Sequence, residues 1–223
     1  MKIWMIIPAY NEARSLERIL RRLKEKNLNI IVIDDGSKDS TYAVAKLKAD
    51  SVIRNEKNLG KGMALRRAIA FLLENEKFDY IITMDGDGQH SASDVDKFIN
   101  EANRGENFVV GNRMDNPQGM PKTRILTNKL MSWLLSKMVS QSIPDTQCGF
   151  RLISRDVLEK IKFRTNKFEV ESEVLVKAAK EGFAIKSIPI QSIYFRRIKS
   201  KIHPFLDTFR FIKFLCTVNG KEK

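Results

Sequence analysis

Short apolar segments alternate with amphipathic ones through the first half of the chain. Five apolar segments have the short, β-branched pattern of buried strands: 3–7, 29–33, 51–54, 79–84 and 107–110. Between them, apolar residues recur every three or four positions and predict helices over 13–26, up to residue 47, over 63–74 and over 92–103. Strands that alternate with helices form mostly parallel sheets with right-handed crossovers. The pattern therefore predicts an α/β fold.

The second half of the chain has a less regular pattern. It predicts helices over 122–140 and 170–181, a strand over 184–190, and a segment within 148–154 that returns to the sheet. A last amphipathic segment covers 204–218. No internal repeat, low-complexity linker or second domain boundary interrupts the 223 residues, so we expect a single domain with an ample core.

Each of the five strands predicted in the first half ends in a polar loop that contains glycine or proline. Ligands of parallel sheets bind at the carboxyl ends of the strands, so consecutive loops of this kind indicate one binding site. The most informative loop reads Asp85-Gly86-Asp87-Gly88-Gln89 and directly follows the fourth strand.

Asp85 and Asp87 are expected to converge, because side chains at i and i+2 of an extended backbone point the same way. Two adjacent carboxylates repel unless a cation lies between them, and hard oxygen ligands suit Mg²⁺ or Mn²⁺ bridging to substrate phosphates. Gln89 continues the alternation and could supply a further oxygen. The alternative interpretation is a polar turn, since Asp and Gly are common turn residues.

The net charge of +13 and the pI of about 9.8 favour a polyanionic partner, such as nucleic acid, an anionic membrane or a phosphorylated substrate. Plain solubility would explain the charge equally well. A nucleic-acid-binding protein is disfavoured, because the chain contains no recognisable binding motif and no cluster of aromatic platforms. The two cysteines, Cys148 and Cys216, are too far apart for a metal or redox motif and predict a reducing, cytosolic compartment.

Four motifs together resemble the family 2 glycosyltransferases with a GT-A fold. They occur in the family's order and spacing: Pro-Ala-Tyr-Asn-Glu at 8–12, Asp-Asp-Gly-Ser at 34–37, Asn-Leu-Gly-Lys-Gly at 58–62, and Asp-Gly-Asp-Gly-Gln at 85–89. Three later stretches resemble the polyprenyl-phosphate branch, which includes the dolichyl-phosphate mannose and glucose synthases: 111–113, 145–151 and 197–201. The run at 145–150 is more similar to the glucosyl members, but both kinds share the metal motif, so the sugar stays open.

The resemblance implies transfer of a hexose, glucose or mannose, from a UDP- or GDP-sugar to a polyprenyl or dolichyl phosphate. The reaction is expected to need Mg²⁺ or Mn²⁺ and to invert the anomeric centre. The alternative is a family 2 enzyme that acts on a soluble or polysaccharide acceptor. A phosphate nucleophile is already ionised near neutral pH, so no general base is needed, and His90 and His203 are expected to be incidental.

The resemblance also assigns the site residues. Those expected to line the nucleoside pocket are Pro8, Tyr10, Glu12 and Asp35, whereas Asp34 is expected to cap the following helix. The metal is assigned to Asp85, Asp87 and Gln89, with Gly86 beside the substrate and Asp87 as a catalytic residue. The acceptor phosphate is assigned to Arg113, Arg197 and Lys201, with Arg113 catalytic. Lys61 is a further candidate near the diphosphate. Two more candidates for the acceptor phosphate are Arg124 and Arg151, but each of these arginines could equally be a surface or helix-end charge.

The segments 122–140 and 204–218 carry Trp, Met, Leu and Phe among Lys and Arg. Such stripes usually pack into a core, but this composition also fits helices that lie in a membrane interface. No apolar run in the chain is long enough to span a bilayer. We therefore expect a peripheral protein on the cytoplasmic face of the membrane, attached through these two segments.

Overall fold

The computed structural model describes residues 1–161 and 169–194, and in them seven strands form one sheet of order β3-β2-β1-β4-β6-β5-β7. The strands are β1 (Ile3–Ala9), β2 (Asn29–Asp34), β3 (Ser51–Arg54), β4 (Tyr80–Thr83), β5 (Phe108–Asn112), β6 (Arg151–Ser154) and β7 (Ile185–Pro189). The α-helices are α1 (Ala13–Leu23), α2 (Thr41–Lys48), α3 (Lys61–Asn75), α4 (Val95–Asn103), α5 (Lys122–Val139), α6 (Arg155–Lys160) and α7 (Glu169–Lys180), with short 3₁₀ turns η1 (Lys24–Lys26) and η2 (Ala92–Asp94).

The α/β prediction is confirmed, and the strand predictions agree with the structure to within a few residues. β6 is the one antiparallel strand of this sheet, because it pairs with β4 on one side and β5 on the other against their direction. The six-residue helix α6 was not predicted from the sequence.

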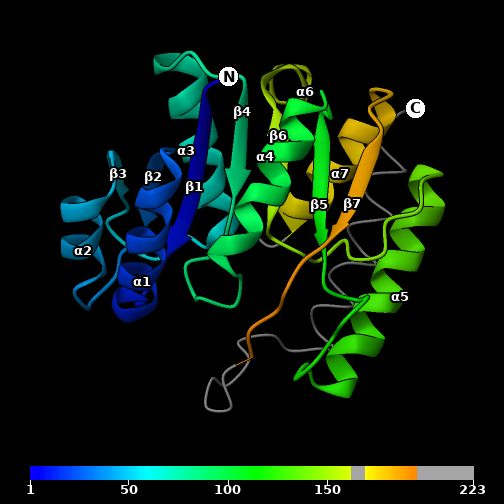
Figure 1. The fold of residues 1–223 in the computed structure, drawn as a ribbon, viewed down its shortest axis with the longest axis horizontal. Coiled ribbons are helices and arrows are strands. Elements are labelled where there is room, and N and C mark those ends of the chain that lie inside the picture. The colour runs from blue at the N-terminus through cyan, green and yellow to red at the C-terminus, as the bar shows by residue number, and fades with distance from the viewer. Residues whose placement is uncertain (162–168, 195–223) are drawn as a thin grey trace.

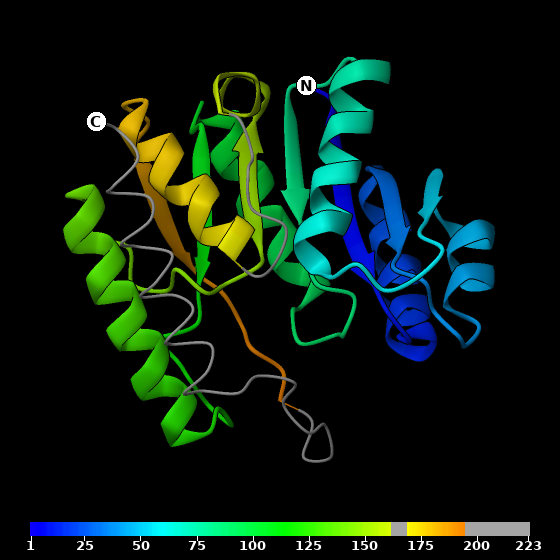
Figure 2. The same ribbon diagram turned by 180° about the vertical axis from the view of Figure 1, so that it is seen from behind.

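Helices cover both faces of the sheet, which explains why the inner strand β1 is apolar throughout. In Figure 1, α1 and α4 lie on the face toward the viewer, and Figure 2 shows α3 and α7 on the opposite face. All seven residues of β1 are buried, as are the last five of β2. The core therefore extends across the sheet and fixes its strands firmly.

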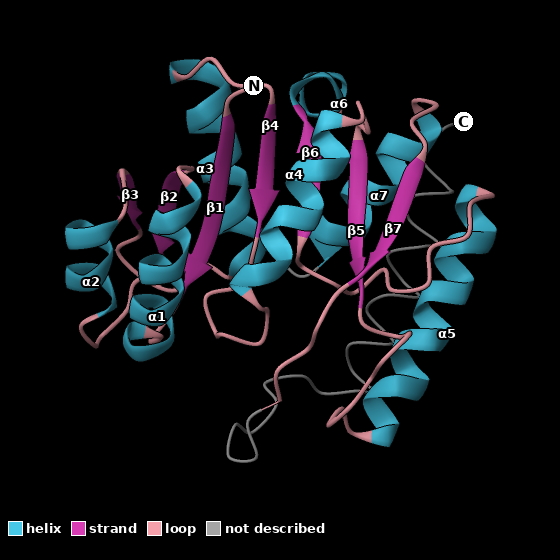
Figure 3. Ribbon diagram, in the orientation of Figure 1, coloured by secondary structure: helices cyan, strands magenta, loops and turns pink. Residues whose placement is uncertain are grey.

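The carboxyl ends of β1, β2, β4 and β5 point to the same edge of the sheet, the lower edge in Figure 3. The loops that the sequence marked as polar leave the sheet here. The N-terminal half of α5 extends beyond this edge, away from the strands (Figure 1). The fold therefore gathers the candidate site residues into one region.

Arg151, at the start of β6, is 2% exposed, so its interpretation as a surface charge is wrong, whereas its role at the acceptor phosphate stays a prediction. Its guanidinium donates to the carbonyls of Cys148 at 2.7 Å, Thr146 at 2.8 Å and Glu171 at 2.5 Å. Burial lowers the pKa of Arg151, and these acceptors stabilise the buried charge. Arg151 thus ties the loop before β6 to the first turn of α7.

One face of α5 packs on the domain through Met131, Ser132 and Leu135. On another face, Leu126, Leu130 and Trp133 are 71%, 45% and 57% exposed. Within the described ranges, no helix has the length and apolar character needed to cross a membrane. Segment 204–218 lies outside the described residues.

We expect Arg151→Met to lower the free energy of unfolding by about 3 kcal/mol, because three buried carbonyls lose a charged donor. Urea denaturation measures the change. The matched control is Arg104→Met, which removes an exposed arginine paired with Glu101 and should change stability by no more than about 0.5 kcal/mol. Equal unfolding midpoints for the two variants would contradict the structural role given to Arg151.

Candidate active site

The Asp85 carboxylate lies just past β4 and faces cationic or polar groups on both sides. Lys61 Nζ is 2.5 Å from Oδ1, and His90 Nε2 is 3.6 Å from Oδ2. The same ammonium lies 2.8 Å from Glu171 Oε1. Lys61 comes from the start of α3 and Glu171 from the first turn of α7. Both helices therefore meet the loop that carries Asp85 at the end of β4.

The two aspartates differ in the balance of burial and neighbouring charge that sets their pKa. Burial opposes ionisation of Asp85, but Lys61 and His90 outweigh it and hold the pKa of Asp85 well below its usual range. Burial likewise opposes the charge of Lys61, but Asp85 and Glu171 raise the pKa of its ammonium. At Asp87 the balance is reversed: burial, together with the charge of Asp85, outweighs Gln89 N–H, His90 and Lys61 and raises its pKa. A cation beside Asp87 would relieve that repulsion.

The donor set fits a divalent ion shared with a substrate. Within the part of the chain that the structure describes, no three His, Cys, Asp or Glu side chains form a complete metal cage. Asp87 Oδ1 accepts from the backbone N–H of Gln89 at 2.9 Å, which holds this carboxylate at the edge of the loop. Mg²⁺ is commonly bound by one or two carboxylates plus substrate phosphates, so Asp85 and Asp87 suffice for such an ion.

Two glycines allow the loops to approach the aspartates. A Cβ on Gly149 would lie 2.9 Å from both Asp85 oxygens and 2.5 Å from Lys61 Nζ. A Cβ on Gly86 would lie 3.0 Å from the carbonyl oxygen of Pro8. A side chain at either position would therefore crowd the site, and the close contact with Gly86 places the Pro8 backbone beside the aspartate motif.

Asp35, predicted to line the nucleoside pocket, binds the loop between β3 and α3. Its Oδ1 accepts from Asn55 Nδ2 at 2.7 Å and Leu59 N at 2.9 Å, and its Oδ2 accepts from Gly60 N at 2.8 Å. The neighbouring Asp34 is buried and pairs with Arg54 at 3.1 Å. Asp35 thus positions the loop that leads into Lys61.

Asp34 does not cap the following helix, which corrects that expectation. Its Oδ1 accepts from Ser37 N, ahead of the helix, at 3.1 Å. The side chain of Asp39 instead accepts from Thr41 N at 2.9 Å, at the first residue of α2.

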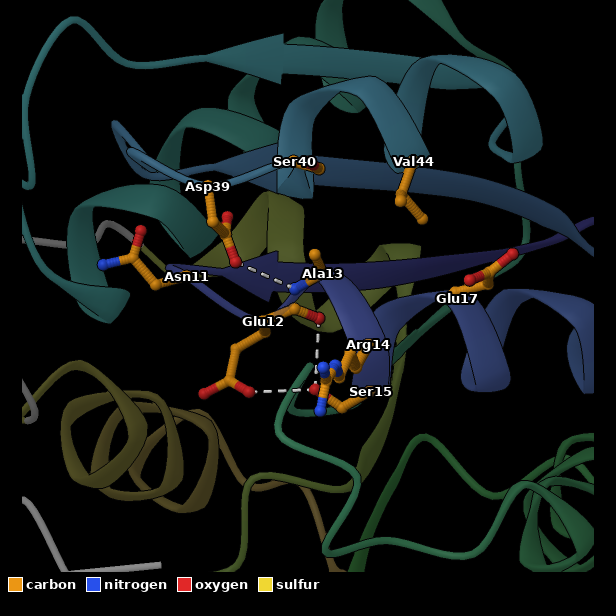
Figure 4. Close-up of a pocket in the computed structure, with 9 residues that line it drawn as sticks. All are labelled: Asn11, Glu12, Ala13, Arg14, Ser15, Glu17, Asp39, Ser40 and Val44. Atoms are coloured by element: carbon orange, nitrogen blue, oxygen red, sulfur yellow. Dashed lines mark hydrogen bonds between the residues drawn. The ribbon is translucent and has the colours of Figure 1, made fainter.

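A hollow of about 530 Å³ lies between the starts of α1 and α2 (Figure 4). Glu12 lines it, and Glu12 Oε2 accepts from Ser15 Oγ at 2.8 Å. Asp39 closes one side by accepting from the Ala13 N–H at 3.3 Å. The hollow adjoins the loops after β1 and β2, whereas Asp85 and Asp87 are not part of its lining. It therefore lies beside the aspartate motif and not at it.

Arg113, predicted to bind the acceptor phosphate, is 4% exposed and faces Asp145. Its Nε and Nη2 donate to the two Asp145 oxygens at 2.7 and 2.9 Å, and its backbone N–H donates to the same carboxylate at 3.1 Å. Asp145 outweighs burial and raises the pKa of Arg113. This fork joins the end of β5 to the loop before β6, and the acceptor role of Arg113 stays a prediction.

Two polar groups on α5 have buried atoms that lack a hydrogen-bond partner among the described residues: Arg124 Nε and Asn128 Nδ2. The Arg124 guanidinium lies 5.8 Å from the ring centre of Tyr194, whose hydroxyl is also unpartnered. The neighbouring Ile193 N–H donates to the Gln89 carbonyl at 2.9 Å. Arg124 thus lies against Tyr194, the residue that follows Ile193, and Ile193 contacts the aspartate motif.

Sequence reasoning named Arg124 but missed Asn128, Tyr194, Asp145 and Glu171. Asp145 lay within a motif already marked, whereas no local pattern distinguishes Asn128 or Glu171 from other polar helix residues. Arg197 and Lys201, predicted to bind the acceptor, lie outside the described residues, so their assignments stay predictions.

The family model described as glycosyl transferase family 2 matches residues 4–162. A UDP-N-acetylglucosamine–dolichyl-phosphate N-acetylglucosaminyltransferase of Methanococcus voltae is 33% identical over 216 residues, covering 86% of this chain and 86% of that protein. A dolichol-phosphate mannosyltransferase of Pyrococcus furiosus is 28% identical over 190 residues, covering 79% and 53% respectively.

Among solved structures, the chain resembles glucosyl-3-phosphoglycerate synthase from Mycobacterium tuberculosis, in complex with Mn²⁺, UDP and glucosyl-3-phosphoglycerate. The TM-score is 0.74 at 21% identity, over 97% of this chain and 79% of that chain. This structural likeness supports the fold alone. The family model and the Methanococcus relative match the amino-acid sequence as well. The chain belongs to the family 2 glycosyltransferases and has their GT-A fold.

Proposed function

We propose that the protein transfers a hexose from a nucleotide-diphosphate sugar to a polyprenyl or dolichyl phosphate, in a metal-dependent and inverting reaction. The observation that carries the proposal is the pair Asp85 and Asp87 at the end of β4, beside the loops after β1 and β2. The names of the relatives from Methanococcus and Pyrococcus support the lipid-phosphate acceptor.

The residues at the carboxyl edge divide the work between donor and acceptor. We assign the nucleoside to Pro8, Tyr10, Glu12 and Asp35, since a carboxylate can accept hydrogen bonds from ribose or base. Asp85, Asp87 and Gln89 would hold Mg²⁺ or Mn²⁺, and a divalent ion there would neutralise the leaving diphosphate as a Lewis acid. The Mn²⁺ and UDP in the mycobacterial synthase are consistent with this assignment.

The acceptor phosphate needs cations but no general base, because a phosphate monoester is already largely ionised at neutral pH. Arg124 supplies a guanidinium with no carboxylate partner among the described residues, and Asn128 lies one helical turn further along. Arginine forks match phosphate geometry. We assign both side chains to the acceptor phosphate, with Arg113, Arg197 and Lys201 as further candidates.

The proposed acceptor is a membrane lipid, and α5 offers a surface for it. Leu126, Leu130 and Trp133 follow one another at i, i+4 and i+7, so they form one exposed stripe. Lys129 and Lys137 lie beside the stripe, and each basic residue near an anionic leaflet contributes about 1 kcal/mol. We infer that α5 attaches the enzyme peripherally to the cytoplasmic face of the membrane.

The metal assignment predicts that Asp85→Asn and Asp87→Asn each abolish turnover that depends on Mg²⁺ or Mn²⁺ and leave the fold intact. Release of nucleoside diphosphate in the presence of a polyprenyl phosphate measures the activity, with UDP-glucose, GDP-mannose and UDP-N-acetylglucosamine as donors. The last donor is included because of the Methanococcus relative. Full turnover in either variant, or in excess chelator, would remove the metal from the mechanism. If only soluble acceptors support turnover, the proposed lipid-phosphate acceptor is wrong.

The acceptor assignment predicts that Arg124→Gln raises the KM for polyprenyl phosphate by roughly tenfold, the effect of losing about 1.4 kcal/mol of a charged hydrogen bond. Nucleotide affinity and the unfolding midpoint should stay unchanged. Arg113→Gln is the contrasting variant, since it strands the buried Asp145 and should also lower stability. A large loss of nucleotide affinity in Arg124→Gln would move this arginine to the donor side.

The membrane assignment predicts sedimentation with anionic vesicles at low salt and release at high salt, because salt screens the attraction of surface charges. Trp133→Ser and reversal of Lys129 and Lys137 to glutamate should each weaken vesicle binding, while hydrolysis of the sugar nucleotide without lipid changes little. Leu47→Ser is the matched control, because Leu47 is an exposed leucine on α2. Absence of vesicle binding at every salt concentration would exclude the peripheral assignment.

A further inference from the structure

Lys61 occupies the position beside Asp85 that a metal would need. Its ammonium is 2.5 Å from Asp85 Oδ1 and only 22% of its side chain is exposed. The other oxygen, Oδ2, has His90 Nε2 at 3.6 Å. The Gly149 backbone closes a third side, because even a Cβ there would lie 2.9 Å from both oxygens. An ion that binds Asp85 must therefore compete with Lys61 for Oδ1.

Lys61 has a second anionic partner that it would keep if it left Asp85. Glu171 Oε1 lies 2.8 Å from the same ammonium, and the Glu171 backbone is fixed because its carbonyl accepts from Arg151 at 2.5 Å. An ammonium released by Asp85 would therefore stay at the site, paired with Glu171. It would also remain beside the position of the donor diphosphate, which carries the opposite charge.

We propose that Lys61 is an exchangeable counter-cation: it neutralises Asp85 in the free enzyme and moves to the donor diphosphate when a divalent ion takes Asp85. This inference rests on the proposed metal and donor sites and adds a mechanism by which the two ligands bind together. Each ligand removes an obstacle for the other, since the ion displaces Lys61 and the diphosphate holds it away from Asp85. Such coupling is reciprocal: nucleotide raises the affinity for metal by the factor by which metal raises the affinity for nucleotide.

The test measures Mn²⁺ binding to the full chain by electron paramagnetic resonance, without nucleotide and with UDP or GDP. We compare the wild type with Lys61→Met and with the control Lys2→Met. Lys2 pairs with Glu76 at 2.8 Å just before β1, at the amino edge of the sheet and hence away from the site. Lys61→Gln is a second variant that keeps a hydrogen-bond donor if Lys61→Met lowers the melting temperature.

Without nucleotide, Lys61→Met should bind Mn²⁺ roughly threefold more tightly or better, because its competitor for Asp85 is gone. The increase in Mn²⁺ affinity that nucleotide causes should be smaller in Lys61→Met than in the wild type. Lys2→Met should match the wild type in both respects. The second comparison separates exchange from simple removal of positive charge, which would leave the effect of nucleotide unchanged.

Equal or weaker Mn²⁺ binding by Lys61→Met, or an undiminished effect of nucleotide, would overturn the exchange and leave the proposed metal site standing. A wild-type protein that binds no Mn²⁺, even with UDP or GDP, would overturn both the exchange and the proposed metal dependence. The two failures are therefore distinguishable in one set of titrations.

Discussion

Two carboxylates held at the end of one buried strand are the constraint on which the site depends. β4 lies between β1 and β6, so the strand that leads into Asp85 and Asp87 is paired on both sides. Burial makes their repulsion costly, as the raised pKa of Asp87 indicates. Lys61 and His90 lie against Asp85 and favour its ionised form. Positive charge beside Asp85 is therefore needed at this point of the fold, and Lys61 supplies it.

The antiparallel strand β6 connects β4 to β5. It inserts between β4 and β5 and brings Gly149 against Asp85 and Asp145 against Arg113. Its first residue, Arg151, also binds the first turn of α7, from which Glu171 reaches Lys61. A single buried arginine therefore positions groups on both sides of the site. The stiffness of this connection explains how elements far apart in sequence meet within hydrogen-bonding distance.

The sequence predicted the elements and the edge that carries the site, but not the partners of its charged residues. Periodicity identifies a strand because burial repeats along it, and the polar loops revealed the carboxyl edge. Periodicity contains no information on which charged side chains pair, so it could not predict the contact between Lys61 and Glu171. Arg151 was misjudged because arginine is rarely buried, and only a ring of three carbonyls makes its burial tolerable.

Three arginines near the site differ in what surrounds them. Arg113 meets a buried carboxylate and Arg151 meets buried carbonyls, so both charges are stabilised inside the protein. Within residues 1–161 and 169–194, Arg124 meets the face of Tyr194, and its Nε has no hydrogen-bond partner there. The same helix exposes Leu126, Leu130 and Trp133. A phosphate attached to a long apolar chain would satisfy both features of α5 at once, whereas a soluble phosphate would leave the apolar stripe in water.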